Sequence, residues 1–393
     1  MIFSRLRKRT IEKTTQMSLT KAVSSIGFAG VETVWAIYMS SFGLTESMIG
    51  FISAILIIIM FMFSFFSTII LEKFSEVKIY LVSSAIIISS LFIIGYSENF
   101  ILFLVIWTFL SIAQLVRAES FTILFRDESS DSDLEKNEGL LFTVLNLGWL
   151  VGPLIAGFIL LTYGVSFVFV SSGVFILIAS YIFYSLKLKE KVKKRDKIDT
   201  NIKQNLKEYF TSEKLILPYL MKMGLEIWWA LIYIYIPLFI IKNGFQESLV
   251  GFFLAAVVIP LILFEFEVGT HCEKYGFKNF FFIGFFSLFI ISIIAFFMND
   301  FMWILGLLVL ASAPAAMLEP IQSPFFFRQV SSNDEEKYYP IYITSLHIGS
   351  FIAKFTIAGL LLFFVDKYVY LLIAGFMLTL AIISLRIKNE QTC

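Results

Sequence analysis

The chain has 393 residues, of which 58% are hydrophobic and only 16% are charged, and its mean hydropathy is +0.85. Because soluble domains carry about 25% charged residues, this composition argues against a soluble enzyme or binding module and indicates an integral membrane protein. The net charge of +1 argues neither for nor against a charged partner, and no nucleic-acid partner is expected.

Twelve apolar segments follow one another along the chain, each close to the length of about 20 residues that a helix needs to cross a bilayer core. They lie near residues 18–42, 46–71, 79–97, 100–126, 139–162, 165–186, 215–242, 247–268, 279–298, 301–327, 339–364 and 368–386. Most connections are only a few residues long, so neighbouring helices are expected to be antiparallel. We therefore predict an all-α polytopic protein with twelve transmembrane helices in a lipid bilayer.

Basic residues are distributed unevenly over the loops between these segments. The two termini and the connector 187–214 fall on one side of the membrane, and that connector alone carries ten Lys and Arg residues. The loops of the opposite side carry only Lys242 and Lys367. Because cytoplasmic loops are enriched in Lys and Arg, we predict cytoplasmic N- and C-termini and a multi-pass protein of the plasma membrane.

One polar stretch is long enough to be a linker, and it lies between the sixth and seventh segments. It predicts an N-terminal six-helix bundle at 1–186, a cytoplasmic basic linker at 187–213 and a C-terminal six-helix bundle at 214–393. A short surface helix is expected at 201–210 within the linker.

Three short stretches of the first half return in the second half, two of them at a separation of 201 residues. The matching pairs are 30–36 with 224–230, 43–51 with 244–252, and 143–148 with 344–349. These repeats predict that the two bundles are pseudo-symmetric. They also predict that one acidic residue of each half, Glu32 and Glu226, lies at a corresponding depth in the membrane.

A loop motif of glycines and charged residues lies between the eighth and ninth segments. Its defining residues are Gly269, Glu273, Lys274, Gly276 and Lys278. A related sequence, which contains Glu72 and Lys73 but lacks both glycines, occurs 201 residues earlier. Such a loop is tight and needs the flexibility of glycine. Its acid can cap a neighbouring helix N-terminus, where the helix dipole favours negative charge.

The fifth segment carries small residues at spacings of four or five, which let membrane helices approach closely. They are Gly148, Gly152 and Gly157, and Pro153 is expected to bend the helix. The corresponding segment of the second half places Lys354 where Gly152 and Pro153 would fall. The eleventh segment is therefore expected to have a chemical role that the fifth lacks.

These motifs, in a chain of two similar six-helix halves, resemble those of the major facilitator superfamily. The resemblance implies the fold of that family, in which the loop motif latches the cytoplasmic gate. The motif of the fifth segment is similar to that of the drug/proton antiporters, whose kinked fifth helix packs between the halves. Those antiporters also carry an arginine followed by Gln-Gly in the fourth span, whereas no such arginine is present near the corresponding Trp107. The paired prolines common in their first span are missing as well.

Two carboxylates lie deep in apolar segments, where a charge costs about 2.5–3.5 kcal/mol and persists when it faces a cavity or a partner. Glu32 and Glu226 are expected near the midplane, where the resemblance implies a substrate site. Both are candidates for binding a proton or a cationic substrate, and Glu32 is the first choice because no lysine lies one turn away from it. A structural pair with Lys222, one turn earlier, is the alternative for Glu226. Trp35 and Trp229, three residues after each glutamate, are expected to wall an aromatic pocket that favours cations.

A lysine lies about 20 Å into the eleventh segment. This residue, Lys354, needs a carboxylate partner, for which the membrane glutamates are candidates. It is interpreted as a structural ion pair, as a switch that substrate breaks, or as a contact for an anionic substrate. His347, two turns earlier on the same face, aligns with Asn146 of the first half, so both halves place a polar group there. His347 is either a hydrogen-bonded structural residue or a proton relay.

Three further charged residues lie about 10–14 Å from the cytoplasmic ends of their helices. They are Arg117 and Glu119 in the fourth segment and Glu319 in the tenth. We expect them to form a set of salt bridges that closes the cytoplasmic side, with direct substrate contact as the alternative.

Together with the resemblance, these features predict a secondary transporter that works by alternating access on a small molecule, and not an enzyme. The expected activity is proton-coupled efflux of small amphipathic or cationic compounds. The alternative is proton-coupled uptake of a small metabolite such as a sugar or an organic anion. No nucleotide-binding Gly-rich loop is present, and neither a cofactor nor a metal is expected. A monomer is expected; a membrane-embedded enzyme and a transport-dead receptor are the rival classes.

Overall fold

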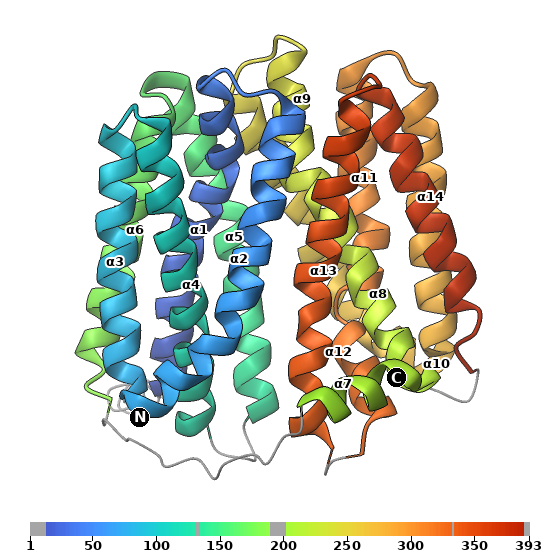
Figure 1. Ribbon diagram of the computed structural model, residues 1–393, viewed down its shortest axis with the longest axis horizontal. Helices are drawn as coiled ribbons and strands as arrows, with labels where there is room; N and C mark the ends of the chain where they lie inside the picture. Colours follow the sequence, from blue (N-terminus) through green and yellow to red (C-terminus); the bar gives the residue numbers. More distant parts are fainter. Residues whose placement is uncertain (1–12, 130–133, 189–201, 332–333, 389–393) are drawn as a thin grey trace, which may run out of the picture. The chain divides into compact units, whose positions relative to one another are not determined.

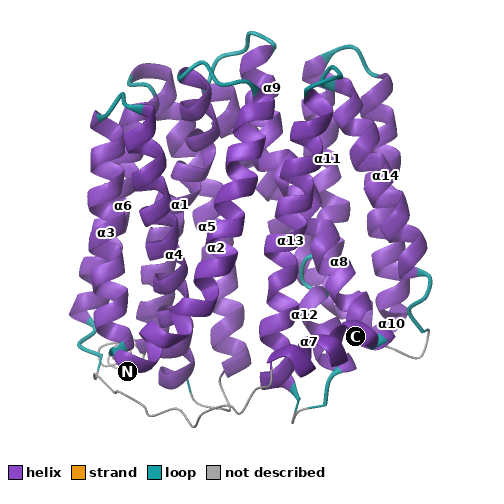
Figure 2. Cartoon of the chain, viewed as in Figure 1, coloured by secondary structure: helices purple, strands orange, loops and turns teal. Residues whose placement is uncertain are grey.

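The computed structural model describes residues 13–129, 134–188, 202–331 and 334–388, and every regular element in these ranges is helical (Figure 1, Figure 2). The helices before the linker are α1 (Lys13–Ser41), α2 (Glu46–Lys73), α3 (Glu76–Tyr96), α4 (Phe100–Glu128), α5 (Leu134–Thr162) and α6 (Val165–Ser185). Those after it are α7 (Ile202–Thr211), α8 (Glu213–Ala230), the π-helical turn η2 (Leu231–Tyr235), α9 (Ile236–Lys242), α10 (Ser248–Phe297), α11 (Phe301–Leu318), α12 (Gln322–Gln329), α13 (Glu335–Leu361) and α14 (Lys367–Ser384). The predicted all-α architecture is confirmed for the described ranges.

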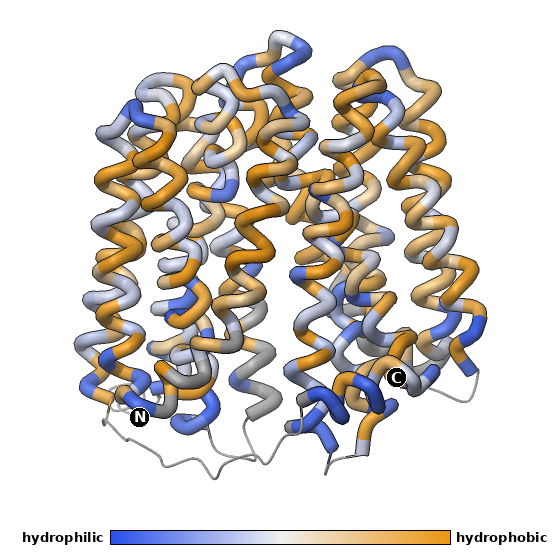
Figure 3. Tube along the Cα trace, viewed as in Figure 1, coloured by the Kyte–Doolittle hydropathy of each residue, from blue (hydrophilic) through white to orange (hydrophobic). Residues whose placement is uncertain are grey.

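Eleven helical segments of the described residues are long and apolar enough to cross a membrane. Each coincides with a predicted span, and the predicted eighth span coincides with a shorter apolar helix, Ser248–Phe264. Figure 3 shows hydrophobic residues along most of the helical lengths, and hydrophilic residues gathered near the helix ends. A polytopic membrane protein is therefore confirmed, while the exact number of twelve spans and the cytoplasmic side of the termini stay predictions.

The described residues divide into two compact units. The first is built from residues of 1–35 and 62–195, and the second from residues of 36–61 and 196–393. In the first unit α3 packs against α4 and α6, and in the second α8 packs against α13 while α10 packs against α11 and α14. The end of α1 and the first part of α2 thus belong to the second unit, although they come from the first half of the chain.

In the first unit α5 approaches α1 very closely at two glycines. A Cβ atom at Gly148 would lie 2.6 Å from the Cβ of Ser25. One at Gly152 would lie 2.6 Å from the carbonyl oxygen of Ile26 and 2.7 Å from the Cβ of Ala29. Side chains of other residues would force the two helices apart, so this packing distance depends on glycine.

The second unit repeats this packing between α13 and α8. A Cβ atom at Gly349, 201 residues after Gly148, would lie 2.9 Å from the Cβ of Glu226. Glu226 is in turn 201 residues after Ser25, so these two residues occupy equivalent places. This packing aligns Glu226 with Ser25 and not with Glu32, which lies two helical turns, about 10 Å, further along α1. That Glu32 and Glu226 lie at corresponding depths stays a prediction. A match shifted by two whole turns keeps its face of the helix but changes its depth.

Positive backbone φ angles support the same separation of 201 residues. Gly43 and Gly244 each have a φ of +79° in the turns that follow the first span of each half. Gly276 has a φ of +77° and a ψ of 155° at a kink inside α10, in a region that favours glycine. Its counterpart Ser75 has a φ of −65°, which any residue adopts. Of the two related loops, only the second therefore depends on a glycine at this position.

The surface helix predicted at 201–210 is present as α7, and its side chains contact α8 and α13 within the second unit. Glu208 accepts hydrogen bonds from the Lys337 ammonium group and from the Tyr338 hydroxyl group, the latter at 3.1 Å. The ring of Tyr209 is buried, and its centroid lies 6.0 Å from that of Tyr219 and 5.8 Å from that of Tyr338. This amphipathic segment is therefore docked against α8 and α13.

Candidate functional site

The second unit gathers ionisable side chains around α8 and α13. Glu226 lies within electrostatic reach of Lys222 on its own helix and of Lys354 on α13. Lys222 is also within reach of Glu319 at the end of α11. The charge of Lys354 also reaches His347, which lies two turns earlier on the same helix. These residues are close enough for their charges to interact, and we call this group of alternating charges the Glu226 cluster. Ion pairs of Glu226 with Lys354 or with Lys222 stay predictions.

The surroundings of the Glu226 cluster fix two of its members. The hydroxyl group of Tyr235, the last residue of η2, donates a hydrogen bond of 2.7 Å to the carbonyl oxygen of Lys354. The ring of His347 packs edge-on against Phe61 at a centroid distance of 6.1 Å. Glu226, Lys354 and His347 are all half-buried, whereas Glu319 is exposed. A π-helical turn inside a span is frequent at functional sites, and here it positions the helix that carries the lysine.

The two tryptophans that follow the predicted glutamates have different surroundings. Trp35 is buried in the first unit and stacks on Trp107 of α4, with a centroid distance of 5.7 Å. Trp229 is half-buried and packs against Tyr233 at 5.7 Å. The local surroundings of the two tryptophans therefore differ, and the aromatic pocket expected between them stays a prediction. Trp35 is a core residue of its unit, and the half-buried Glu32 lies beside it on α1.

Arg117 lies in the core of the first unit, with 3% of its surface exposed. Its Nε donates a hydrogen bond of 2.8 Å to the Ser84 hydroxyl group, and an Nη atom donates one of 2.5 Å to the Tyr80 hydroxyl group. Among the described residues Arg117 and Glu119 do not form an ion pair with each other, and the set of salt bridges expected with Glu319 stays a prediction. Side chains two residues apart on a helix point to different sides, and one carboxylate oxygen of Glu119 is buried without a hydrogen-bond partner among the described residues.

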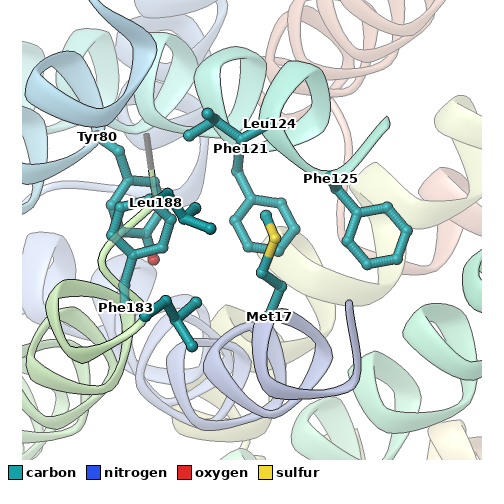
Figure 4. Close-up of a cluster of buried hydrophobic side chains, with 8 residues drawn as sticks. Met17, Tyr80, Phe121, Leu124, Phe125, Phe183 and Leu188 are labelled. Carbon is teal, nitrogen blue, oxygen red and sulfur yellow. The ribbon is translucent and has the colours of Figure 1, made fainter. Parts of the chain in front are cut away.

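A lysine that the sequence analysis did not select lies close to Arg117. The Nζ of Lys21 is 5.5 Å from the ring centroid of Phe121, and that ring is 6.0 Å from the ring of Tyr80, on which the guanidinium group stacks at 4.4 Å. Tyr80 and Phe121 belong to the buried cluster of Figure 4. The available signal in the sequence was the separation of 201 residues between Lys21 and Lys222.

The structure describes the predicted latch loops and packing motif only in part. Lys73 is exposed at the end of α2, and Lys278 is half-buried just after the kink in α10. Four latch residues lie outside the part whose side chains the structure describes: Glu72, Gly269, Glu273 and Lys274. In α5, Asn146 is half-buried, and Pro153 and Gly157 are buried within the helix.

A set of polar contacts that was not predicted joins the start of α2 to other helices of the second unit. Lys242 at the end of α9 forms ion pairs with Glu46 at 3.2 Å and with Asp366 at 2.7 Å. The Ser47 hydroxyl group donates a hydrogen bond of 2.7 Å to the carbonyl oxygen of Ala358. We call these five residues the Lys242 cluster. The one signal for this cluster in the sequence was that Lys242 is one of the few basic residues on the side predicted to face away from the cytoplasm.

The backbone of α2 also lies close to α13 and η2 near this cluster. A Cβ atom at Gly50 would lie 2.2 Å from the hydroxyl oxygen of Tyr235 and 2.8 Å from the Cβ of Ala358. The rings of Phe51 and Phe355 pack edge to face at 5.4 Å. Ion pairs, a hydrogen bond and close packing thus hold residues 36–61 in the second unit.

Comparison with known proteins gives a consistent result for the fold. The family model described as Major Facilitator Superfamily matches residues 17–264. The nucleoside transporter NupG has a similar structure, with a TM-score of 0.76 at 13% identity over 96% of this chain and 100% of that one. A peptide transporter POT in complex with sulfate has a TM-score of 0.77 at 12% identity, with 96% and 95% of the chains covered.

A further solved structure of similar fold is a bacterial homologue of the human lysosomal transporter Spinster. It has a TM-score of 0.77 at 12% identity, and the alignment covers 96% of this chain and 97% of that one. No curated protein sequence matches the chain significantly. At sequence identities of 12–13%, the similarity to these three structures shows a shared fold and nothing more.

Proposed function

We propose that this chain, which belongs to the major facilitator superfamily, is a secondary transporter that couples the movement of a small molecule to protons. The transporter fold of its structural neighbours supports transport. The observation that carries the proposed coupling is the position of Glu226 within electrostatic reach of two lysines inside a membrane span.

A half-buried carboxylate flanked by lysines can exchange a lysine for a proton as the partner of its charge. When Lys354 is close, its ammonium group compensates the charge of Glu226. When a conformational change withdraws that lysine, the carboxylate loses a counter-charge in a medium of low dielectric constant, and binding a proton becomes favourable. Return of the lysine then favours release of the proton. Glu226 is thus the proposed carrier, Lys354 its charge partner and His347 a relay, and Glu32 is proposed as a second carboxylate of the pathway.

The substrate that we propose is a small amphipathic or cationic compound, exported in exchange for protons. Two features support it, the acidic residues Glu32 and Glu226 in the spans and the packing of Gly148 and Gly152 in α5, which is similar to that of drug/proton antiporters. Uptake of a small organic anion is the second candidate. It is favoured by the cations of the first unit, which are described below.

The arrangement in the membrane is part of the same proposal. We place a six-helix bundle at 1–186, a linker at 187–213 and a bundle at 214–393, with both termini in the cytoplasm and the protein as a monomer in the plasma membrane. The loop motifs and the charges of α4 and α11 would then close the cytoplasmic side. The Lys242 cluster would close the opposite side.

The test uses everted membrane vesicles with an acidic interior and a pH-sensitive dye. A panel of lipophilic cations, sugars and organic acids is added to vesicles that carry the wild type, Glu226→Gln or Glu32→Gln. Glu213→Gln is the matched control, because it removes an exposed carboxylate from the same helix as Glu226. We expect a lipophilic cation to release protons in the wild type and in the control but not in Glu226→Gln.

The outcomes separate the two candidate substrates and the two carboxylates. Proton release that survives Glu226→Gln but is lost in Glu32→Gln would move the proton carrier to α1. If no cation releases protons from wild-type vesicles, efflux of cations is excluded. Proton movement driven by an organic acid would instead establish anion transport.

A further inference from the structure

Two cationic side chains lie together in the first unit, Lys21 on α1 and Arg117 on α4. Arg117 is buried, and Lys21 is half-buried and close enough for their charges to repel each other. The guanidinium group stacks on Tyr80 at 4.4 Å and lies 5.4 Å from the ring centroid of Phe28. The ammonium group lies over Phe121 at 5.5 Å. One cation is thus enclosed, and the other lies closer to the accessible surface.

The groups that surround these cations within the described residues are aromatic rings and hydroxyl groups, and no carboxylate among them forms an ion pair with either. Ser84 and Tyr80 accept hydrogen bonds from Arg117. Glu128 at the end of α4 forms its ion pair with Lys13 instead, at 3.2 Å. Two like charges without a counter-anion are costly in a medium of low dielectric constant.

In the second unit, the lysine that corresponds to Lys21 has a carboxylate as its counter-charge. Lys222 is 201 residues after Lys21, and its counter-charge Glu226 is 201 residues after Ser25. The packing of Ser25 against Gly148 and of Glu226 against Gly349 gives the same correspondence. Where the second unit has a carboxylate, the first unit therefore has a serine, and an additional cation, Arg117, is present nearby.

We propose that Lys21 and Arg117 form a binding site for a small anion that carries a phosphate or carboxylate group. Such groups accept charge-assisted hydrogen bonds from ammonium and guanidinium groups, and these are among the strongest in proteins. Lys21 contacts the anion, and the enclosed Arg117 contributes its charge from behind. The site goes beyond the proposed transport cycle, because it holds whether the anion is the substrate or a second ligand. The competing explanation is a purely structural cation pair.

The test measures binding without any transport step. The full-length protein is purified in an uncharged detergent, and inorganic phosphate or acetate is added at constant ionic strength set by chloride. A ligand of the folded state raises the thermal unfolding midpoint in a saturable manner. We expect such a rise in the wild type and at least about a tenfold higher half-saturating concentration in Lys21→Gln. Lys13→Gln removes an exposed lysine from the same helix and should leave the response unchanged.

A pair of substitutions at Ser25 provides a sharper comparison. Ser25→Glu introduces the carboxylate that the second unit has at the equivalent place, whereas Ser25→Gln introduces a side chain of the same size without charge. We expect the internal carboxylate to abolish the response to phosphate and the neutral variant to retain it. This pair decides the matter if Lys21→Gln does not fold, since both variants carry the same steric load.

The source of the anion is distinguished in nanodiscs with and without phosphatidylglycerol. A response to phosphate that the anionic lipid suppresses identifies a headgroup as the occupant, and one that persists identifies a soluble anion. The proposal is overturned if phosphate, acetate and anionic lipid all leave the wild-type midpoint unchanged. It is also overturned if the response survives both Lys21→Gln and Ser25→Glu, which would indicate adventitious ion binding only. Neither result bears on proton coupling, which the vesicle assay tests separately.

Discussion

Among single residues, Gly152 carries a clear steric demand, because a methyl group on its Cα would lie 2.6 Å from the carbonyl oxygen of Ile26. Gly152→Ala must therefore separate α5 from α1, and overpacking of this kind costs about 1–3 kcal/mol. We expect a lower thermal unfolding midpoint in detergent. Gly359→Ala in α13 is the control, since no atom lies within 4 Å of the added group and alanine favours a helix over glycine. Equal midpoints for the two variants would contradict this account.

For single residues, some contacts between helices could be predicted from the sequence and others could not. The spacing of Gly148 and Gly152 predicts close helix packing, because small residues on one face have few other uses in a membrane helix. The partners of Arg117 were not predictable, because the hydroxyl groups that bind it belong to another helix, α3. The local sequence match pairs Glu226 with Glu32, whereas the packing pairs it with Ser25, because seven residues are almost exactly two helical turns. A local match preserves the face, and only contacts between helices reveal the depth.

Among the helices, α7 is fixed by the contacts of Glu208 with α13. Hydrogen bonds from Lys337, Gln204 and Tyr338 lower the pKa of this carboxyl group from 4.5 to about 2. Because the folded pKa is depressed, the stabilisation of the docked helix is present above about pH 4.5 and is lost as the pH falls toward about 2. We expect the amides of α7 to exchange hydrogen faster in Glu208→Gln than in the wild type at pH 7. That difference should shrink at pH 3.

The control for this prediction is another charged residue of α7. Lys203 is exposed, and Lys203→Gln should leave hydrogen exchange in α7 unchanged at both pH values. An effect of Glu208→Gln that is equally large at pH 3 and pH 7 would contradict an electrostatic tether. It would instead attribute the docking of α7 to the buried ring of Tyr209.

The positions of most helices follow from hydropathy, because a span must be apolar over about 20 residues and must form its hydrogen bonds internally. Interruptions inside a span follow from finer features. The predicted span at 301–327 is divided in the structure into α11 and α12. Pro320 lies in the gap, where it lacks an N–H donor and disfavours a helical conformation of the residue before it. The π-helical turn η2 is followed at once by Pro237 of α9, whose missing N–H cannot bond to the Tyr233 carbonyl and whose ring crowds that carbonyl.

At the scale of the whole molecule, the compact units do not follow the two halves of the chain. Residues 36–61 come from the first half and pack in the second unit, held by the Lys242 cluster and by the close approach at Gly50. Alternating access moves the two halves of such transporters relative to each other. If this protein works in that way, these contacts must break and reform in every cycle, and they act as a gate.

A gate of this kind makes a prediction for Lys242. Lys242→Gln removes both ion pairs, and each partly exposed pair contributes about 0.2–1 kcal/mol. The closed form should therefore open roughly two- to thirtyfold more often. The reporter is Ser47→Cys, because the Ser47 side chain is buried against Ala358 in the closed form. We expect a membrane-impermeant maleimide, added from outside, to label this cysteine faster by about that factor in the Lys242→Gln background.

The matched control is the other lysine expected on that side of the membrane. Lys367 lies over the rings of Phe296 and Tyr368, and it forms no ion pair within the described residues, so Lys367→Gln removes the same charge without opening the contact. Equal labelling rates in the two backgrounds would show that the Lys242 cluster is not a gate. Faster labelling that is confined to Lys242→Gln would also report on the movement of the two halves of the chain. Because the reporter belongs to the first half of the chain and the removed lysine to the second, it would demonstrate that the two halves separate at this point.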